Sequence, residues 1–131
     1  MKLTVRNVGI TTSGTTETEG AILVTAPSSL IALLFAFDFD TTTDGFRTQI
    51  AVTFNSEVLA LSAFPSGELN NMIAMVRAVH HITTSGATIQ SISKYIPLPG
   101  IPVEAGASIR VKGRCSTTGT LQGYLYAYLV S

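Results

Sequence analysis

Alternation of apolar and polar side chains with a period of two residues constrains the fold of this sequence most strongly. It is clearest in the last third, where Ile109 and Val111 alternate with Arg110, Lys112 and Arg114. A final segment follows, with one set of side chains on each side: Leu121, Leu125, Ala127 and Leu129 against Tyr124, Tyr126 and Tyr128. Successive side chains of a strand point to opposite faces, so each segment predicts a strand with one core face.

Similar segments recur along the chain, separated by short turns rich in Gly, Ser, Thr and Asp. Besides the two C-terminal strands, we predict strands at residues 2–8, 21–26, 30–39, 46–54, 58–64 and 88–96, and a polar loop at 11–20. Eight or nine antiparallel strands over residues 1–131 predict an all-β fold. The expected architecture is a single-domain β-sandwich, specifically a jelly roll.

Three segments need separate interpretation. Leu30–Phe39 is almost continuously apolar, which predicts a strand buried on both faces. Residues 66–82 fit either a short helix near 66–80 or a strand over 72–82. Pro97, Pro99 and Pro102 predict an extended, non-helical connection.

Charge is scarce in this chain: 12% of residues are charged, 46% are hydrophobic, and the net charge is zero. Low charge with high hydrophobicity argues against disorder, and the missing basic excess argues against a nucleic-acid binder. The longest apolar run, Leu30–Phe37, is too short to span a bilayer, and no signal peptide is recognised, so we expect no membrane association. A weakly charged, neutral surface favours self-association.

Two clusters were weighed as metal sites. Asp38, Asp40 and Asp44 have the residue type that calcium prefers, but their spacing does not match an EF-hand, and a turn is the preferred interpretation. His80 and His81 are adjacent, so their side chains diverge on a strand and on a helix. We therefore expect no metal and no cofactor.

Cys115 is the single cysteine, which excludes an internal disulfide. Arg114 beside it would favour a thiolate nucleophile, but a buried, inert cysteine is the commoner state. The sequence contains neither a Gly-x-Ser-x-Gly elbow nor a phosphate-binding glycine pattern. We expect no catalytic residues and no enzymatic activity.

The tyrosine face of the last strand is the best candidate for a functional surface. Tyr124, Tyr126 and Tyr128 are not needed for a core that the opposite leucines already supply, and tyrosine is enriched at protein contacts. Arg110 and Lys112 are predicted to position the partner electrostatically, although charges on an exposed edge strand are the simpler reading. These five residues form the predicted interface.

The segment from Ile96 to Val111 resembles a stretch of jelly-roll structural proteins in tailed-phage virions, in which a proline-flanked strand leads through a glycine turn into an aliphatic–basic strand. The resemblance implies a capsid decoration (cement) protein, a homotrimer bound to the major capsid protein. It would be made in the host cytoplasm and located on the virion surface. The alternative is a carbohydrate-binding or receptor-binding β-sandwich module of a fibre or adhesin.

Overall fold

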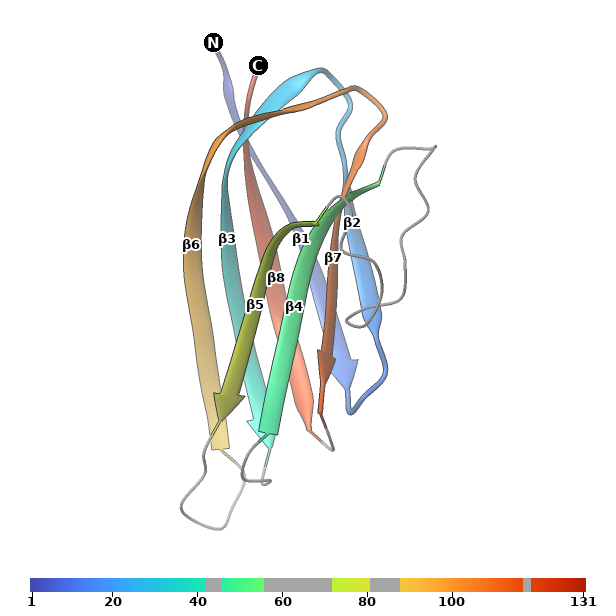
Figure 1. The fold of residues 1–131 in the computed structure, drawn as a ribbon, viewed down its shortest axis with the longest axis vertical. Coiled ribbons are helices and arrows are strands. Elements are labelled where there is room, and N and C mark those ends of the chain that lie inside the picture. Colours follow the sequence, from blue (N-terminus) through green and yellow to red (C-terminus); the bar gives the residue numbers. More distant parts are fainter. Residues whose placement is uncertain (42–45, 56–71, 81–87, 117–118) are drawn as a thin grey trace.

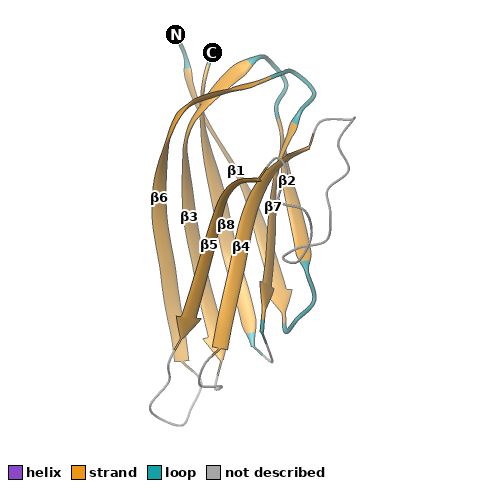
Figure 2. Cartoon of the chain, viewed as in Figure 1, coloured by secondary structure: helices purple, strands orange, loops and turns teal. Residues whose placement is uncertain are grey.

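The computed structural model of this protein describes residues 1–41, 46–55, 72–80, 88–116 and 119–131. These ranges contain strands and turns, with no helix that could cross a membrane (Figure 2). The strands are β1 (Leu3–Ser13), β2 (Thr18–Leu23), β3 (Ser28–Thr41), β4 (Phe46–Asn55), β5 (Met72–His80), β6 (Thr88–Val103), β7 (Ser108–Cys115) and β8 (Thr120–Val130).

The strands form two four-stranded antiparallel sheets that lie face to face (Figure 1). Sheet A has the order β1-β8-β3-β6, and sheet B has the order β2-β7-β4-β5. Strand one pairs with eight, two with seven, three with six, and four with five. This nested pairing is that of one long hairpin folded into two layers, as in a jelly roll. The predicted β-sandwich is confirmed.

The core lies between the two sheets and is built from alternate residues of each strand. Sheet A contributes three fully buried phenylalanines, Phe35, Phe37 and Phe39, together with the leucines of β8. Sheet B contributes aliphatic side chains of β4 and β7, such as Ile50 and Val111. Burying each such side chain stabilises the fold by about 1.5–3 kcal/mol, which explains why the alternation predicted the sandwich.

The loop predicted at residues 11–20 is wrong over most of its length. Thr11–Ser13 continue β1 and pair with Thr120–Gln122, while β2 begins at Thr18. Threonine fits the pleated surface of a sheet well, so hydroxyl-rich segments extend strands when a partner strand is available. Only residues 14–17 remain between the two strands.

The predictions for residues 66–82, for the proline segment and for residues 30–39 have different outcomes. Residues 72–80 form a strand, so of the two alternatives the strand is confirmed and the helix is wrong over that range. Residues 66–71 and the strand predicted at 58–64 lie outside the described residues. The proline segment is extended as predicted, but it belongs to β6, an edge strand of sheet A, where a missing N–H donor is tolerated.

The prediction that Leu30–Phe39 is buried on both faces is only half right. Its inner residues are buried, but Leu34 and Ala36 point away from sheet B and are only partly buried. No second layer of the described chain covers this outer side of sheet A. An apolar strand therefore lies in the middle of a sheet with one face open.

Candidate assembly surface

The outer face of sheet A is a pleated surface on which residues of neighbouring strands stand in rows. The antiparallel pairing of β1, β8, β3 and β6 places four residues in one row across the sheet: Asn7, Tyr126, Leu34 and Tyr95. On one side follows the row of Val5, Tyr128, Ala32 and Pro97, and on the other the row of Gly9, Tyr124, Ala36 and Ser93. The three predicted tyrosines therefore share one face with apolar and small residues of the adjacent strands.

All four tyrosines of the chain lie on this face, because Tyr95 of β6 joins the three of β8. Tyr95 and Tyr128 meet edge to face with ring centroids 6.1 Å apart, and Tyr124 and Tyr126 are also 6.1 Å apart. Tyr95 is 58% exposed and Tyr124 is 51% exposed, whereas Tyr126 and Tyr128 are half-buried. Sequence analysis missed Tyr95, although its alternation with Ile96 placed it opposite the core.

Charge is nearly absent from this face. Among the described residues that the strand alternation directs outward from sheet A, only Asp38 and Asp40 of β3 are charged. Both lie at one end of the face, and the Oδ1 atom of Asp38 accepts a hydrogen bond of 2.6 Å from Ser91 Oγ. Leu3 and Val5, both exposed, lie towards the other end. The face is thus apolar and aromatic over most of its length and acidic at one end.

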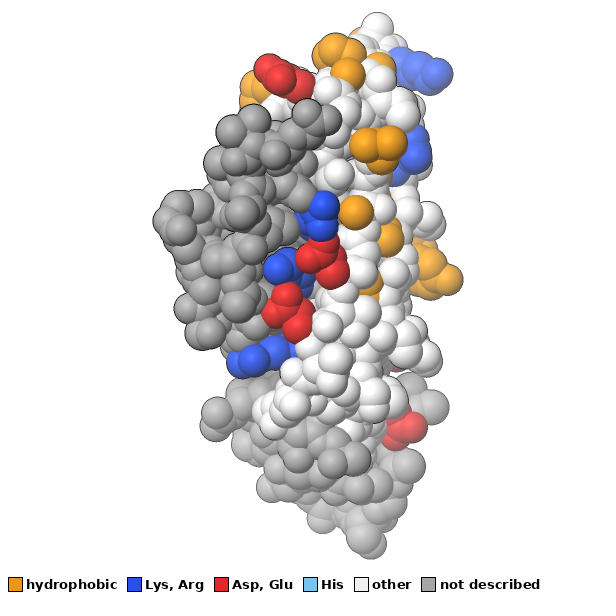
Figure 3. Space-filling view, turned by 90° about the vertical axis from the view of Figure 1, so that its right-hand side faces the viewer, with side chains coloured by type: hydrophobic (Ala, Val, Ile, Leu, Met, Phe, Trp, Pro, Cys, Tyr) orange, Lys and Arg blue, Asp and Glu red, His pale blue; other side chains and the backbone are white. Residues whose placement is uncertain are grey.

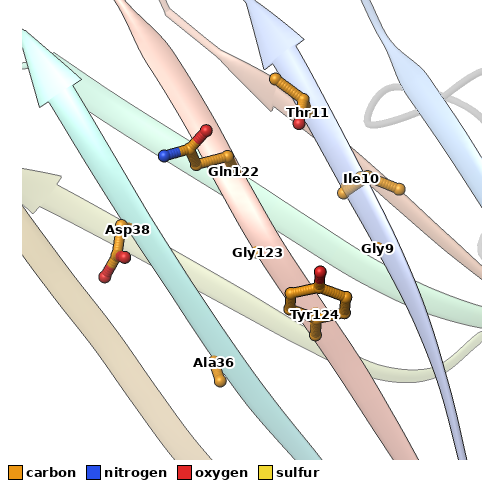
Figure 4. Close-up of a pocket in the computed structure, with 8 residues that line it drawn as sticks. All are labelled: Gly9, Ile10, Thr11, Ala36, Asp38, Gln122, Gly123 and Tyr124. Carbon is orange, nitrogen blue, oxygen red and sulfur yellow. The ribbon is translucent and has the colours of Figure 1, made fainter.

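A shallow cavity of about 390 Å³ opens on this face beside Tyr124 (Figure 4). It exists because Gly9 and Ala36 flank Tyr124 in its row and offer little side chain to fill the surface. Asp38 and Gln122 line it from the next row. The face therefore has a hollow beside the exposed ring of Tyr124.

Gly123 sets how closely the strands under this hollow approach each other. A Cβ atom at this position would lie 2.6 Å from the Cα atom of Phe37 and would also collide with the carbonyl oxygen of Ala36. Real Cβ atoms do not approach backbone this closely, so β8 and β3 pack here only because residue 123 is glycine.

The predicted cations lie elsewhere. Arg110 and Lys112 point outward from sheet B, on the opposite side of the sandwich from the tyrosines. Arg110 forms an ion pair with Glu19. The Nζ atom of Lys112 lies 3.1 Å from Glu17 and 3.6 Å from Glu19. Figure 3 shows acidic and basic side chains alternating on the side of the molecule where β2 and β7 lie.

This arrangement bears on the predicted electrostatic role of the two cations. The Lys112 side chain is only 8% exposed and already contacts two carboxylates of its own chain. A buried, paired cation has little capacity to reach a partner. The structure thus brings the three tyrosines together and places Arg110 and Lys112 in a separate, internally compensated network.

Among the described residues, the remaining candidates are not gathered into a site. Within the described ranges, no group of three or more His, Cys, Asp and Glu residues could hold a metal ion, while Asp44 and His81 lie outside those ranges. Cys115 is buried in the core, and burial raises the pKa of its thiol to about 11. Such a thiol is protonated at neutral pH and is a poor nucleophile. The activating effect of Arg114 considered above is outweighed.

No known protein family and no curated protein matches the sequence. Its fold is similar to parts of solved structures of infectious bursal disease virus. The Gx strain structure is 13% identical, with a TM-score of 0.44, over 99% of this chain and 33% of that chain. A structure of the viral particle is 13% identical, with a TM-score of 0.45, over 98% of this chain and 31% of that chain. The chain spans about a third of the length of these proteins.

Proposed function

We propose that this chain is a non-enzymatic structural protein of a viral capsid, of the decoration (cement) type, which self-associates through the outer face of sheet A and stabilises neighbouring capsid subunits. The observation that carries the proposal is the exposed, almost uncharged face bearing all four tyrosines. The capsid setting comes from the resemblance of residues 96–111 to virion jelly rolls.

The chemistry of the face favours protein contact over solvent exposure. Tyrosine rings bury a large area at low entropic cost and keep a hydroxyl for a hydrogen bond, so they are enriched at contact sites. Apolar neighbours such as Leu34 and Val5 add area whose burial contributes about 25 cal/mol per Å². The few charges limit the cost of removing water from the face.

The oligomer mass in solution tests self-association. Light scattering after size-exclusion chromatography should give a multiple of 13.8 kDa, and the resemblance to virion jelly rolls implies three copies. Tyr126→Ala should shift the mass towards one copy with little change in melting temperature. Arg110→Ala, on the other outer face, is the matched control and should leave the mass unchanged. An unchanged oligomer with a lowered melting temperature for Tyr126→Ala would make the tyrosines part of the fold only.

Binding to undecorated capsids tests the cement function separately. The wild-type chain should co-sediment with such capsids and raise the temperature at which they disassemble, while a monomeric tyrosine variant should do so less well because it loses avidity. A chain that self-associates but binds no capsid would retain the assembly surface and refute the cement role.

The hollow beside Tyr124 favours a second candidate, a carbohydrate-binding module. An aromatic ring next to a carboxylate and an amide, here Tyr124, Asp38 and Gln122, provides an apolar surface with hydrogen-bonding groups at its rim. A glycan array with and without calcium tests it, with Asp38→Asn as the variant. Specific binding lost in Asp38→Asn would support this candidate, and no bound glycan would refute it.

A further inference from the structure

The extent and the charge distribution of the outer face of sheet A favour one alignment of two contacting copies. We infer that the face packs against the same face of a second copy, with antiparallel strand directions and a two-fold axis along the row of Tyr126. This inference rests on the self-association proposed above and adds the partner, the symmetry and the register.

The size of the face suits a pair of copies. Four strands about 4.8 Å apart and five rows about 6.8 Å apart give about 650 Å² per copy, or about 1,300 Å² in total. This total lies at the lower limit of specific protein contacts. A surface that contacts its own copy about a two-fold axis is fully used by two subunits, so the contact closes as a dimer rather than the trimer expected from the sequence.

Charge separates the two possible alignments. If the strands of the two copies ran in the same direction, the ends of the face that carry Asp38 and Asp40 would lie over each other. With antiparallel strands, these carboxylates lie over the opposite end, which carries Leu3, Ser29 and Val130 and where Lys2 precedes β1. Like charges facing each other oppose association, so the antiparallel alignment is favoured.

Overlap of the two faces sets the register, because an axis along the middle of the five rows, that of Tyr126, pairs every row with another. A two-fold axis along the row of Tyr126 places the row of Tyr128 over the row of Tyr124 in the second copy. The half-buried ring of Tyr128 then meets the more exposed ring of Tyr124, with the small residues Gly9 and Ala36 beside it. Each copy contributes one Tyr128 and one Tyr124, so the two-fold axis forms this aromatic contact twice. Two sheets that pack in this way form an aligned sandwich, with their strand axes about 30° apart.

Charge complementation between variants tests the register. Tyr124→Glu and Tyr128→Lys should each weaken the dimer at least about tenfold, because each places a charge against an aromatic ring. Mixing these two variants should restore a one-to-one dimer, since residue 124 of one copy faces residue 128 of the other. The matched control mixes Tyr124→Glu with Tyr124→Lys, and no restoration is expected. Circular dichroism of each variant verifies that it is folded.

The outcomes distinguish this inference from the function on which it rests. A monomeric wild-type protein would overturn self-association itself. A dimer restored by Tyr124→Glu with Tyr124→Lys would overturn the antiparallel alignment only. A wild-type trimer would overturn the two-fold axis and retain self-association, and a dimer restored by neither mixture would overturn the register.

Discussion

The two outer faces of this sandwich differ in the type of side chain that they carry and in how those side chains are paired. On sheet B, Arg110 and Lys112 are matched by Glu17 and Glu19 of the same chain. On sheet A, tyrosine rings and aliphatic side chains stand in rows with almost no charge among them. The first face is complete within one chain, whereas the second leaves apolar area that only another surface can cover.

This difference in charge indicates which of the two faces is suited to contact with another molecule. A partner placed on sheet B would remove water from charges that gain little in return, because they are already paired. A partner placed on sheet A removes water mainly from carbon atoms, which is favourable. The charges of sheet B are therefore compensated within the chain, while the outer face of sheet A is the one suited to association.

The largest expected effect lies beneath the tyrosine face. Gly123→Ala should lower the free energy of unfolding by about 3 kcal/mol or more, because the new Cβ atom forces β8 away from the backbone of β3. Urea unfolding monitored by circular dichroism measures it. Gly9→Ala is the control, since its Cβ atom would meet the movable ring of Tyr124 at 3.2 Å. Equal losses for both variants would contradict this explanation.

The next effect concerns the inner side of sheet B, where Cys115 is 2% exposed. Burial raises the pKa of its thiol from 9.0 to about 11, so the unfolded chain loses this proton at a lower pH than the folded chain. Below pH 9 the thiol is protonated in both the folded and the unfolded chain, and its contribution to stability is fully present. The free energy of unfolding should then fall by roughly 2–3 kcal/mol as the pH rises from 9 to 11. Unfolding curves of wild type and Cys115→Ala over this range isolate the effect, and parallel pH profiles would refute it.

Removal of Lys112 should separate folding from association. Lys112→Ala should cost about 2 kcal/mol of stability, because Glu17 and Glu19 lose a largely buried partner. The oligomer mass should not change at a protein concentration where the variant remains folded. Lys112→Met keeps most of the packing and serves as the control for charge. A loss of association at unchanged stability would give Lys112 the contact role predicted from the sequence.

Salt should give the smallest and most selective effect. Raising NaCl from 50 mM to 1 M screens the partly exposed pair of Arg110 and Glu19, so Arg110→Ala should cost less than about 1 kcal/mol at low salt and nothing measurable at high salt. Dissociation of the oligomer should change by less than about threefold, since its face is nearly uncharged. Sedimentation at both salt concentrations measures this, and strong salt dependence would place charged pairs in the contact.

The local sequence pattern predicted those features that depend on the alternation of side chains within a strand. The opposite faces of Tyr126 and Leu125 followed directly from this alternation, and so did the sandwich. The pairing of strands that are distant in the sequence could not be predicted from it. Glu19 and Arg110 are 91 residues apart, and Glu19 lay in a segment predicted to be a loop, so the compensation of the cations could not be foreseen.

The open outer face of β3 was missed for a related physical reason. An apolar run indicates that both sides of a strand avoid water, but it does not say whether the cover belongs to the same chain. Leu34 and Ala36 are only partly buried in the monomer, and their burial becomes complete only if another molecule supplies the second cover. The sequence signal for burial and the proposed association agree once the assembled state is considered.

The nested strand order also determines when, during synthesis, the tyrosine face can form. β8, which carries three of the four tyrosines, inserts between β1 and β3 in the middle of sheet A. During synthesis, residues 1–119 can form neither the complete sheet nor its tyrosine rows, and pairings between such distant strands form slowly. A growing chain thus lacks the proposed association surface until β8 has left the ribosome. Under the proposed function, the place of β8 in the strand order keeps subunits from associating until this sheet has formed.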